Sequence, residues 1–262
     1  MYYLISDVEA FGATQKLNPT VQLGATIIDY DIFCIAAKEG FIKLQSESLN
    51  EAEALKYVGV VSQFESYVLV EPKICLPLHE FESLVESCLV TDDNKTAICN
   101  ILRTNYMIDH EEEARCKVEF WCHHMDKYEQ ITSNVYDETK TPQSQEVFNN
   151  FVEWSREICN GHKVQVCTDT AGFDVGRINN MITRPTSALS MNYLFVGQDG
   201  HPIYNSIMDV DSFADGICAA LPEFRTLKHP EWPVEHNHSP KSDSAYIGLQ
   251  HLFKLYTLSS NQ

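Results

Sequence analysis

The sequence predicts a mixed α/β fold, with one β-sheet flanked by helices. Strand-forming runs are concentrated in the first 44 residues, and a helix, a strand and a second helix follow one another after residue 142. A final helical pattern ends the chain. Strands that come first and then alternate with helices are typical of mixed α/β domains. With no internal repeat along its 262 residues, the chain is expected to form a single domain, residues 1–262, that carries one insertion.

The N-terminal region predicts a three-stranded meander. Residues 2–8 are largely apolar and lead into a turn at residues 9–12. Residues 21–28 form a second β-rich run, and residues 40–44 are the predicted third strand. Residues 45–115 then mix acidic stretches with a short apolar run, so we interpret them as an inserted, partly helical elaboration.

The C-terminal half predicts three helices and one strand. The first helix is predicted over residues 148–159, where apolar residues recur at helical spacing before a glycine. Residues 163–168 are a predicted strand, and after a turn a second helix ends before Pro185. The last helix is predicted over residues 242–258, because its apolar positions form the stripe of a helix that packs on a sheet. The stripe consists of Ala245, Leu249, Leu252 and Tyr256.

The charge balance excludes several classes of protein. Lys and Arg number 19 against 37 Asp and Glu, which gives a net charge of −18, and 44% of the residues are hydrophobic. The chain can therefore bury a core and is not disordered. It is not a general nucleic-acid coat either, since so acidic a surface repels phosphate backbones. If the substrate is a polyanion, metal ions must help to hold it.

The cysteines and the apolar runs indicate the compartment. The nine cysteines are odd in number and contain no C-x-x-C pair, which favours free thiols in a reducing environment. No run approaches the roughly 18 to 20 apolar residues of a membrane span, and the N-terminus turns acidic before a signal-peptide core could form. We therefore expect a soluble, cytoplasmic protein without membrane partners. The oligomeric state stays open, with a homodimer as one option.

Two carboxylates lie at the end of the first predicted strand. Asp7 and Glu9 are two residues apart, so the alternation of side chains projects both from the same face. Such a pair repels itself unless it is solvated or a divalent cation neutralises it. For the pair alone both interpretations stay open, a solvated strand end and a metal site. We expect neither side chain in the core.

Further candidates lie at predicted helix starts and in one loop. Asp174 follows the strand-to-helix turn and Asp243 begins the last helix, where an Asp is also a favoured cap. His238 lies in the loop five residues before Asp243. Asp169 is a second candidate for the middle position and His236 for the histidine, although the five-residue spacing favours His238.

The ordered set resembles the DEDDh group of 3′-to-5′ exonucleases, which have the ribonuclease H-like fold. Within that group it is most similar to the phage exonuclease A type and its bacterial exoribonuclease relatives. The resemblance covers roughly residues 1–44 and 116–257, and it favours Asp174 over Asp169 in the middle motif. The predicted insertion is longer than the family pattern. The matching segments are residues 5–12, 118–121, 172–178 and 238–245.

The resemblance implies hydrolysis of phosphodiester bonds at nucleic-acid 3′ ends, with release of nucleoside monophosphates. Four carboxylates would hold two divalent ions, Mg²⁺ or Mn²⁺, because hard oxygen ligands suit these ions. Asp7 would bridge both ions, Glu9 and Asp243 would complete the first site, and Asp174 would hold the second. His238 would take the proton from the attacking water.

The resemblance also implies a substrate and its position. Phe11 and Gly12 follow the first motif where relatives pass the terminal nucleotide, so a stacked base and a close backbone approach are expected there. A buried phenylalanine and a turn glycine are the equal alternative. The expected partner is single-stranded or short nucleic acid, DNA or RNA, with a free 3′ end.

Two other classes of function are alternatives to an exonuclease. The first is a catalytically inactive ribonuclease H-like module that binds proteins, although none of the five motif residues is missing. The second is a zinc protein built on residues 122–124 together with His236 and His238. Zinc ligands usually arrive as two close pairs, whereas three consecutive side chains on a helix diverge.

Overall fold

The computed structural model describes most of the chain, which forms two compact units. The first unit contains Met1–Val8, Leu23–Glu65 and Phe148–Gln262, and the second contains Glu9–Gln22 and Ser66–Val147. Within them the structure describes residues 1–12, 20–45, 49–70, 83, 94, 96–100, 120–182 and 190–260.

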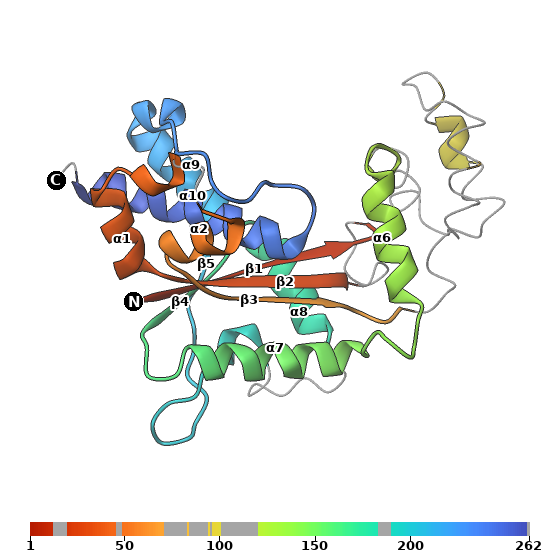
Figure 1. Cartoon of the computed structure of the whole chain (residues 1–262). Coiled ribbons are helices and arrows are strands. Elements are labelled where there is room, and N and C mark those ends of the chain that lie inside the picture. Colours follow the sequence, from red (N-terminus) through yellow and green to blue (C-terminus); the bar gives the residue numbers. More distant parts are fainter. Residues whose placement is uncertain are drawn as a thin grey trace. The chain divides into compact units, whose positions relative to one another are not determined.

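A five-stranded sheet forms the centre of the first unit, with the strand order β3-β2-β1-β4-β5 (Figure 1). β1 pairs in parallel with β4, and Ser6 lies opposite Thr168. β4 pairs in parallel with β5, and Thr168 lies opposite Asp209. The carboxyl ends of β4 and β5 therefore lie side by side next to Ser6, in the middle of β1. In open α/β sheets, ligands bind at the carboxyl ends of the strands. The strands are β1 (Tyr2–Ala10), β2 (Thr20–Asp29), β3 (Val60–Tyr67), β4 (Val164–Thr168) and β5 (Ile207–Asp209).

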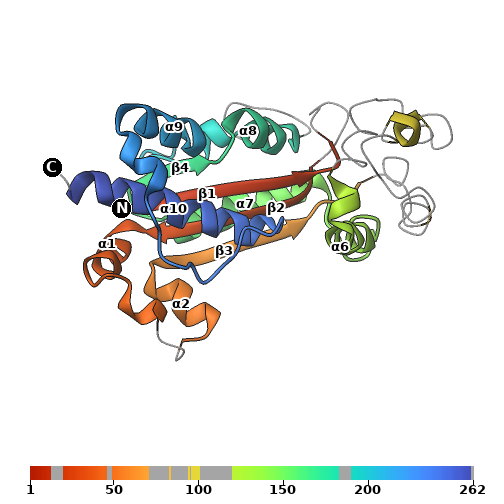
Figure 2. The same ribbon diagram turned by 90° about the horizontal axis from the view of Figure 1, so that it is seen from above.

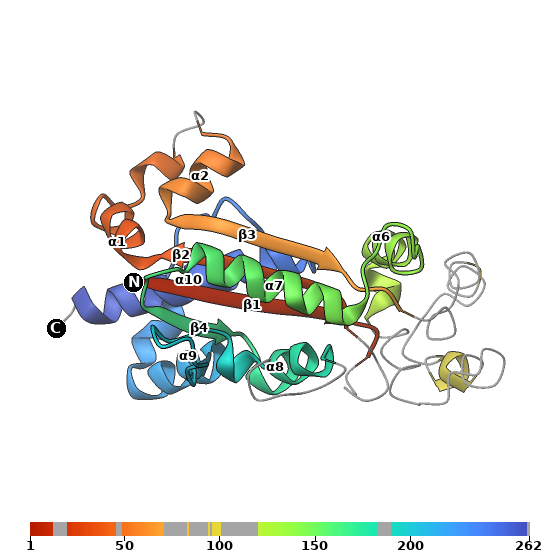
Figure 3. The same cartoon turned by 90° about the horizontal axis from the view of Figure 1, so that it is seen from below.

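Helices cover both faces of this sheet. α10 runs along one face (Figure 2), and α7 runs along the opposite face (Figure 3). α7 is fixed on β3, since the rings of Phe64 and Phe151 lie 5.7 Å apart and Trp154 donates a hydrogen bond of 3.0 Å to Ser62. The helices of this unit are α1 (Tyr30–Lys38), α2 (Glu51–Tyr57), α7 (Ser144–Ile158), α8 (Ala171–Asn180), α9 (Val210–Ala220) and α10 (Pro240–Ser260), with 3₁₀ turns at Ile42–Gln45, Met191–Tyr193 and Pro222–Thr226.

α10 approaches the sheet closely because two glycines leave room for it. A Cβ atom at Gly248 would lie 2.8 Å from side-chain atoms of both Ile5 and Ile28, and a Cβ atom at Gly24 would overlap the backbone of Pro240. The apolar face of α10 then joins the buried core of β1 and β2, with Leu249 fully buried. This contact fixes the first turn of α10 over the strands.

The second unit contains an aromatic cluster beside a helix. The Phe11 ring is fully buried, with ring centroids 5.8 Å from Trp121 and 5.5 Å from Tyr128. Tyr128 lies on α6 (Met125–Val135), and Trp121 begins the 3₁₀ turn Trp121–His123. Of the segment 118–121, residues 118 and 119 lie outside the described residues.

The predicted fold class, a mixed sheet flanked by helices, is confirmed. The first two strands, the strand at residues 163–168 and all three C-terminal helices are present near their predicted bounds. Sequential neighbours β1, β2 and β3 are also adjacent in the sheet, as a meander requires.

The predicted third strand at residues 40–44 is wrong. That segment is the 3₁₀ turn Ile42–Gln45, and it follows α1, which the sequence analysis missed. α1 begins after Asp29, whose side chain accepts a hydrogen bond from Asp31 N. The third strand is β3, a half-exposed edge strand that lies inside the predicted insertion. Of the predicted insertion at residues 45–115, residues 46–48, 71–82, 84–93, 95 and 101–115 lie outside the described residues, and the insertion stays a prediction.

The sequence also made predictions about the cysteines and about membrane-spanning segments. The six described cysteines are free thiols. Among the described residues, no helix combines the length and the apolar character that a membrane crossing requires.

The close approach at Gly24 gives a test of how α10 is held. Gly24→Ala should reduce the free energy of unfolding by about 1–3 kcal/mol, because the new methyl group meets backbone that cannot move aside without shifting α10. Gly216→Ala on α9 is the matched control, since its Cβ atom would meet open space. The control should be neutral or stabilising by up to about 1 kcal/mol. Urea unfolding of both variants measures the difference, and equal stability of the two would contradict this packing.

Candidate metal centre

The parallel register of β1 and β4 brings two aspartates together where β4 ends. Asp7 follows Ser6 on β1, and Asp169 follows Thr168, the last residue of β4. Because Ser6 and Thr168 are paired in a parallel ladder, the residues after them lie side by side. Asp7 is 9% exposed, so the expectation that it stays out of the core is wrong. Glu9, two residues further along β1, is half-buried.

α8 supplies a third carboxylate to the same point. Asp174 lies in the first turn of α8 and is 1% exposed. The N-cap of this helix is Thr170, whose backbone N–H donates to Asp169 Oδ1 at 2.6 Å and to Asp174 Oδ2 at 3.3 Å. The helix start is also tied to β5, since Ala171 N donates to Asp209 Oδ2 at 3.0 Å. Asp174 is therefore not merely a cap.

Asp7, Asp169 and Asp174 form a compact cluster of carboxylates. One ligand atom from each lies within 4.8 Å of the others. Burial raises the pKa of Asp7 well above its ordinary value, and the charges of Asp169 and Asp243 raise it further. Burial also raises the pKa of Asp174, followed by its hydrogen bond with Asp169 and the charge of Asp7. A single proton or a cation must therefore offset the repulsion at this point.

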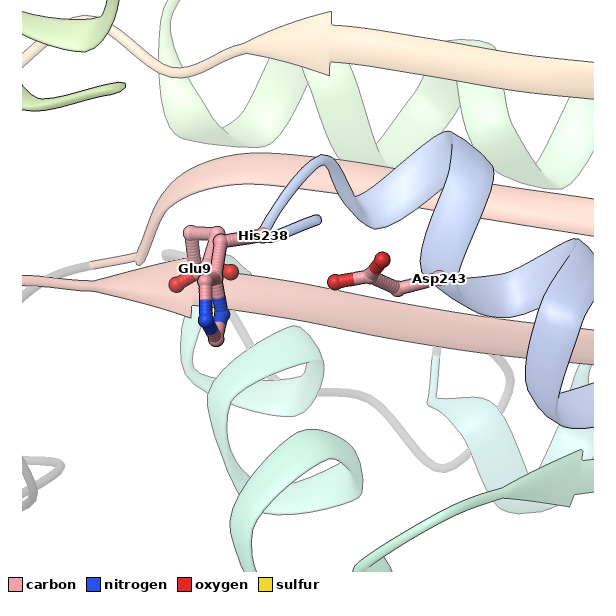
Figure 4. Close-up of side chains that lie close together, drawn as sticks. All are labelled: Glu9, His238 and Asp243. Atoms are coloured by element: carbon pink, nitrogen blue, oxygen red, sulfur yellow. The ribbon is translucent and has the colours of Figure 1, made fainter. Parts of the chain in front are cut away.

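α10 and the loop before it bring a fourth carboxylate and two histidines. Asp243 is 2% exposed, and its Oδ1 accepts a hydrogen bond of 2.8 Å from Asn237 N. His236 Nε2 lies 3.6 Å from Asp243 Oδ2. His238 has a positive φ of 59°, and a ligand atom of its ring lies within 4.8 Å of one from Asp243. Figure 4 shows His238 and Asp243 together with the side chain of Glu9.

The donor chemistry of the cluster fits a hard divalent cation. Asp174 Oδ1 is fully buried and has no hydrogen-bond partner among the described residues. The groups that raise the pKa of Asp7 include two further carboxylates, whereas a hydrogen bond with the backbone of Val8 lowers it. Buried oxygens of this kind suit Mg²⁺ or Mn²⁺. Within the described part of the chain, neither group of convergent metal-ligand side chains contains a cysteine, so the zinc alternative gains no support.

A cavity of about 260 Å³ opens beside the carboxylates between α9 and α10. Asp169 forms one part of its wall and the charged groups of Asp211 and Lys254 form another. His251, which is 3% exposed, also lines it. Burial lowers the pKa of His251 to about 4, so this imidazole is neutral at neutral pH.

The predicted substrate contacts, Phe11 and Gly12, belong to the second unit. Phe11 is buried against Trp121 and Tyr128 in the second unit, and Gly12 follows it after the end of β1. Of the two alternatives for Phe11, a stacking surface or a buried core residue, its packing matches the buried one. A contact of Phe11 or Gly12 with a nucleotide stays a prediction.

The structure places Asp169 and His236 close to the predicted site residues, although the sequence motifs favoured Asp174 and His238. Both were second choices for positions in the motif, yet Asp169 lies in the carboxylate cluster and His236 contacts Asp243. The signal that would have found Asp169 is the parallel register of β1 and β4, which one sequence does not reveal.

Comparisons with known proteins give structural likenesses only. No family model matches the chain, and no curated protein matches it in sequence. The nuclease domain of 3′hExo, a DEDDh family member solved with bound rAMP, is 10% identical with a TM-score of 0.45, covering 97% of this chain and 92% of that chain. Exonuclease I with bound product is 14% identical with a TM-score of 0.45, covering 98% of this chain and 44% of that chain. Escherichia coli exonuclease I with a dT13 oligonucleotide is 15% identical with a TM-score of 0.45, covering 99% and 42%.

The chain spans less than half the length of the exonuclease I chains that it matches. We therefore base the proposed function on the residues of this chain.

The buried carboxylates predict how stability depends on pH in metal-free buffer. A carboxyl whose pKa is higher in the folded chain than its ordinary 3.8 holds its proton more tightly when folded, so stability falls as pH rises above that value. Asp174→Asn removes one such group. Its melting temperature relative to wild type should therefore increase steadily between pH 5 and pH 8. A difference that does not change with pH in EDTA-containing buffer would show that the cluster is not strained by charge.

Proposed function

We propose that the chain is a metal-dependent 3′-to-5′ exonuclease of the DEDDh type with a ribonuclease H-like fold. It would hydrolyse phosphodiester bonds at nucleic-acid 3′ ends and release nucleoside monophosphates. The observation that carries the proposal is the cluster of Asp7, Asp169 and Asp174, in which two buried carboxylates and the half-buried Asp169 converge within 4.8 Å. The order of the sequence motifs supports it, and we propose that the chain is most similar to the phage exonuclease A branch.

The carboxylates would hold two divalent ions. Asp7 is proposed to contact both, Glu9 and Asp243 to complete one site, and Asp174 to hold the other. Mg²⁺ or Mn²⁺, when bound, would neutralise the negative charge that develops on the phosphodiester oxygens. Asp243 keeps its orientation because Asn237 N holds one of its oxygens.

His238 is proposed as the general base. A neutral imidazole accepts a proton from the attacking water, and the ring of His238 lies near Asp243 in the loop before α10. The left-handed backbone at His238 sets the direction in which this side chain leaves the loop. His236 Nε2 lies 3.6 Å from Asp243 Oδ2, but the His236 side chain is 50% exposed, so we expect its loss to disturb that carboxylate little.

The substrate is proposed to be single-stranded or short nucleic acid with a free 3′ end. A net charge of −18 leaves little surface for a long track of phosphate contacts, so the ions would contribute most of the attraction. Phe11 and Gly12 are the proposed contacts of the terminal nucleotide. DNA and RNA are both kept as substrates.

Removal of Asp7 tests the proposal most simply. Asp7→Asn keeps the size of the side chain, and we expect it to abolish the ladder of shortened products from 5′-labelled single-stranded DNA and RNA in Mn²⁺. The control is Asp215→Asn, an exposed carboxylate on α9, which should retain full turnover. A wild-type protein that gives no ladder with either substrate would instead favour the inactive, protein-binding module. Full turnover of Asp7→Asn, or of wild type in excess EDTA, would refute the metal mechanism.

The two histidines are separated by single substitutions assayed at pH 7.5. His238→Ala should lower the turnover number on the order of 10²-fold, the usual scale for the loss of a general base. His236→Ala should be nearly silent. Wild-type turnover should rise with pH through the ordinary range of histidine titration, and this rise should disappear in His238→Ala. If His236→Ala is the inactive variant, the assignment of the last motif is wrong.

A further inference from the structure

Asp169 is a fifth carboxylate at a centre for which the sequence motifs account for four. Its ligand atom lies within 4.8 Å of those of both Asp7 and Asp174. Its place is set by the backbone, since it directly follows the β4 residue that is paired with Ser6 of β1 and with Asp209 of β5. Asp169 is therefore held where β4 and β5 end beside the middle of β1, not on a freely moving loop.

Hydrogen bonds on both sides of Asp169 keep its carboxylate in this position. Its Oδ1 accepts from Thr170 N at 2.6 Å, and its backbone carbonyl accepts from Asp211 N at 3.4 Å. The first bond occupies one carboxylate oxygen and leaves the second as an acceptor. A structural turn requires only the first bond, which an uncharged side chain could equally supply.

An independent observation points to a ligand at this place. Asp174 is 1% exposed, and its Oδ1 has no hydrogen-bond partner among the described residues. A buried carboxylate oxygen without a partner is costly, and a cation is the group that satisfies several such oxygens at once. Asp169 also lines the cavity between α9 and α10, so its side chain borders both the cluster and an open space.

We propose that Asp169 is a fifth carboxylate ligand of the divalent-cation centre, on the side of Asp174. The inference rests on the proposed function, because it concerns the same ions. It adds that the centre carries one more negative charge than the four-carboxylate motif supplies. The cost of that charge is repulsion in the metal-free protein, and its benefit is tighter binding of the cation.

Asp169→Asn separates this role from a structural one. The asparagine keeps a side-chain oxygen for Thr170 N and removes only the charge. We expect the metal-free melting temperature to rise, because one repelling carboxylate is gone. We expect Mn²⁺ affinity, measured by isothermal titration calorimetry, to fall on the order of tenfold or more. The stabilisation by saturating Mn²⁺ should shrink accordingly.

Two companion variants complete the experiment. Asp215→Asn removes an exposed carboxylate of α9 that neither lines this cavity nor belongs to the cluster, and it should leave Mn²⁺ affinity within about twofold of wild type. Asp169→Glu restores a charge at the position and should recover part of the lost affinity.

The possible outcomes distinguish this inference from the proposed function. If wild type and Asp169→Asn bind Mn²⁺ equally, the inference is overturned and the proposed function stands. A lower metal-free melting temperature of Asp169→Asn with unchanged affinity would likewise assign Asp169 a purely structural role. If wild type itself binds no Mn²⁺ while DNA or RNA is still shortened, both the metal centre and this inference fail.

Discussion

The repulsion between carboxylates that converge at the carboxyl end of β4 governs the arrangement of this site. Parallel pairing of β1 with β4 places Asp7 and Asp169 side by side, and the short turn into α8 adds Asp174. Water screens such charges poorly where Asp7 and Asp174 are almost fully covered. The folded chain must therefore hold this cluster against its own electrostatic energy, through the packing around it.

Helices that pack on the two faces of the sheet provide most of this packing. α10 lies close to β1 and β2 because Gly24 and Gly248 have no side chains, and its apolar face is buried with Ile5 and Ile28. The same contact fixes the first turn of α10, so that Asp243 and the preceding loop with His238 have defined places. The apolar residues of α10, β1 and β2 form one core, and the carboxylate cluster lies beside it.

The sequence was sufficient for elements with a clear apolar pattern. The buried strands β1 and β2 were predicted from continuous apolar, β-rich runs, and α7 and α10 from apolar residues that recur every three to four positions. β3 was missed since an edge strand is half-exposed and rich in polar residues, and α1 was missed because its start follows directly from β2. β5 has only three residues, too few for a pattern.

The candidate site shows the same division. Asp7, Asp174 and Asp243 could be named from short motifs, and the structure places each of them in a buried position. The membership of Asp169 depends on the register between two strands more than 150 residues apart in the chain, which no local pattern encodes. The contact of His236 with Asp243 depends on the path of the loop before α10, which no local pattern encodes either.

The central claim, that divalent cations neutralise the buried carboxylates, is tested most directly by crystals of the wild-type protein soaked in Mn²⁺. An anomalous difference map recorded at the manganese absorption edge should show a peak whose nearest protein atoms are the carboxylate oxygens of Asp7 and Asp174. A map without a peak there, from crystals in which these carboxylates are paired with one another through protons or with a cationic side chain, would contradict the account.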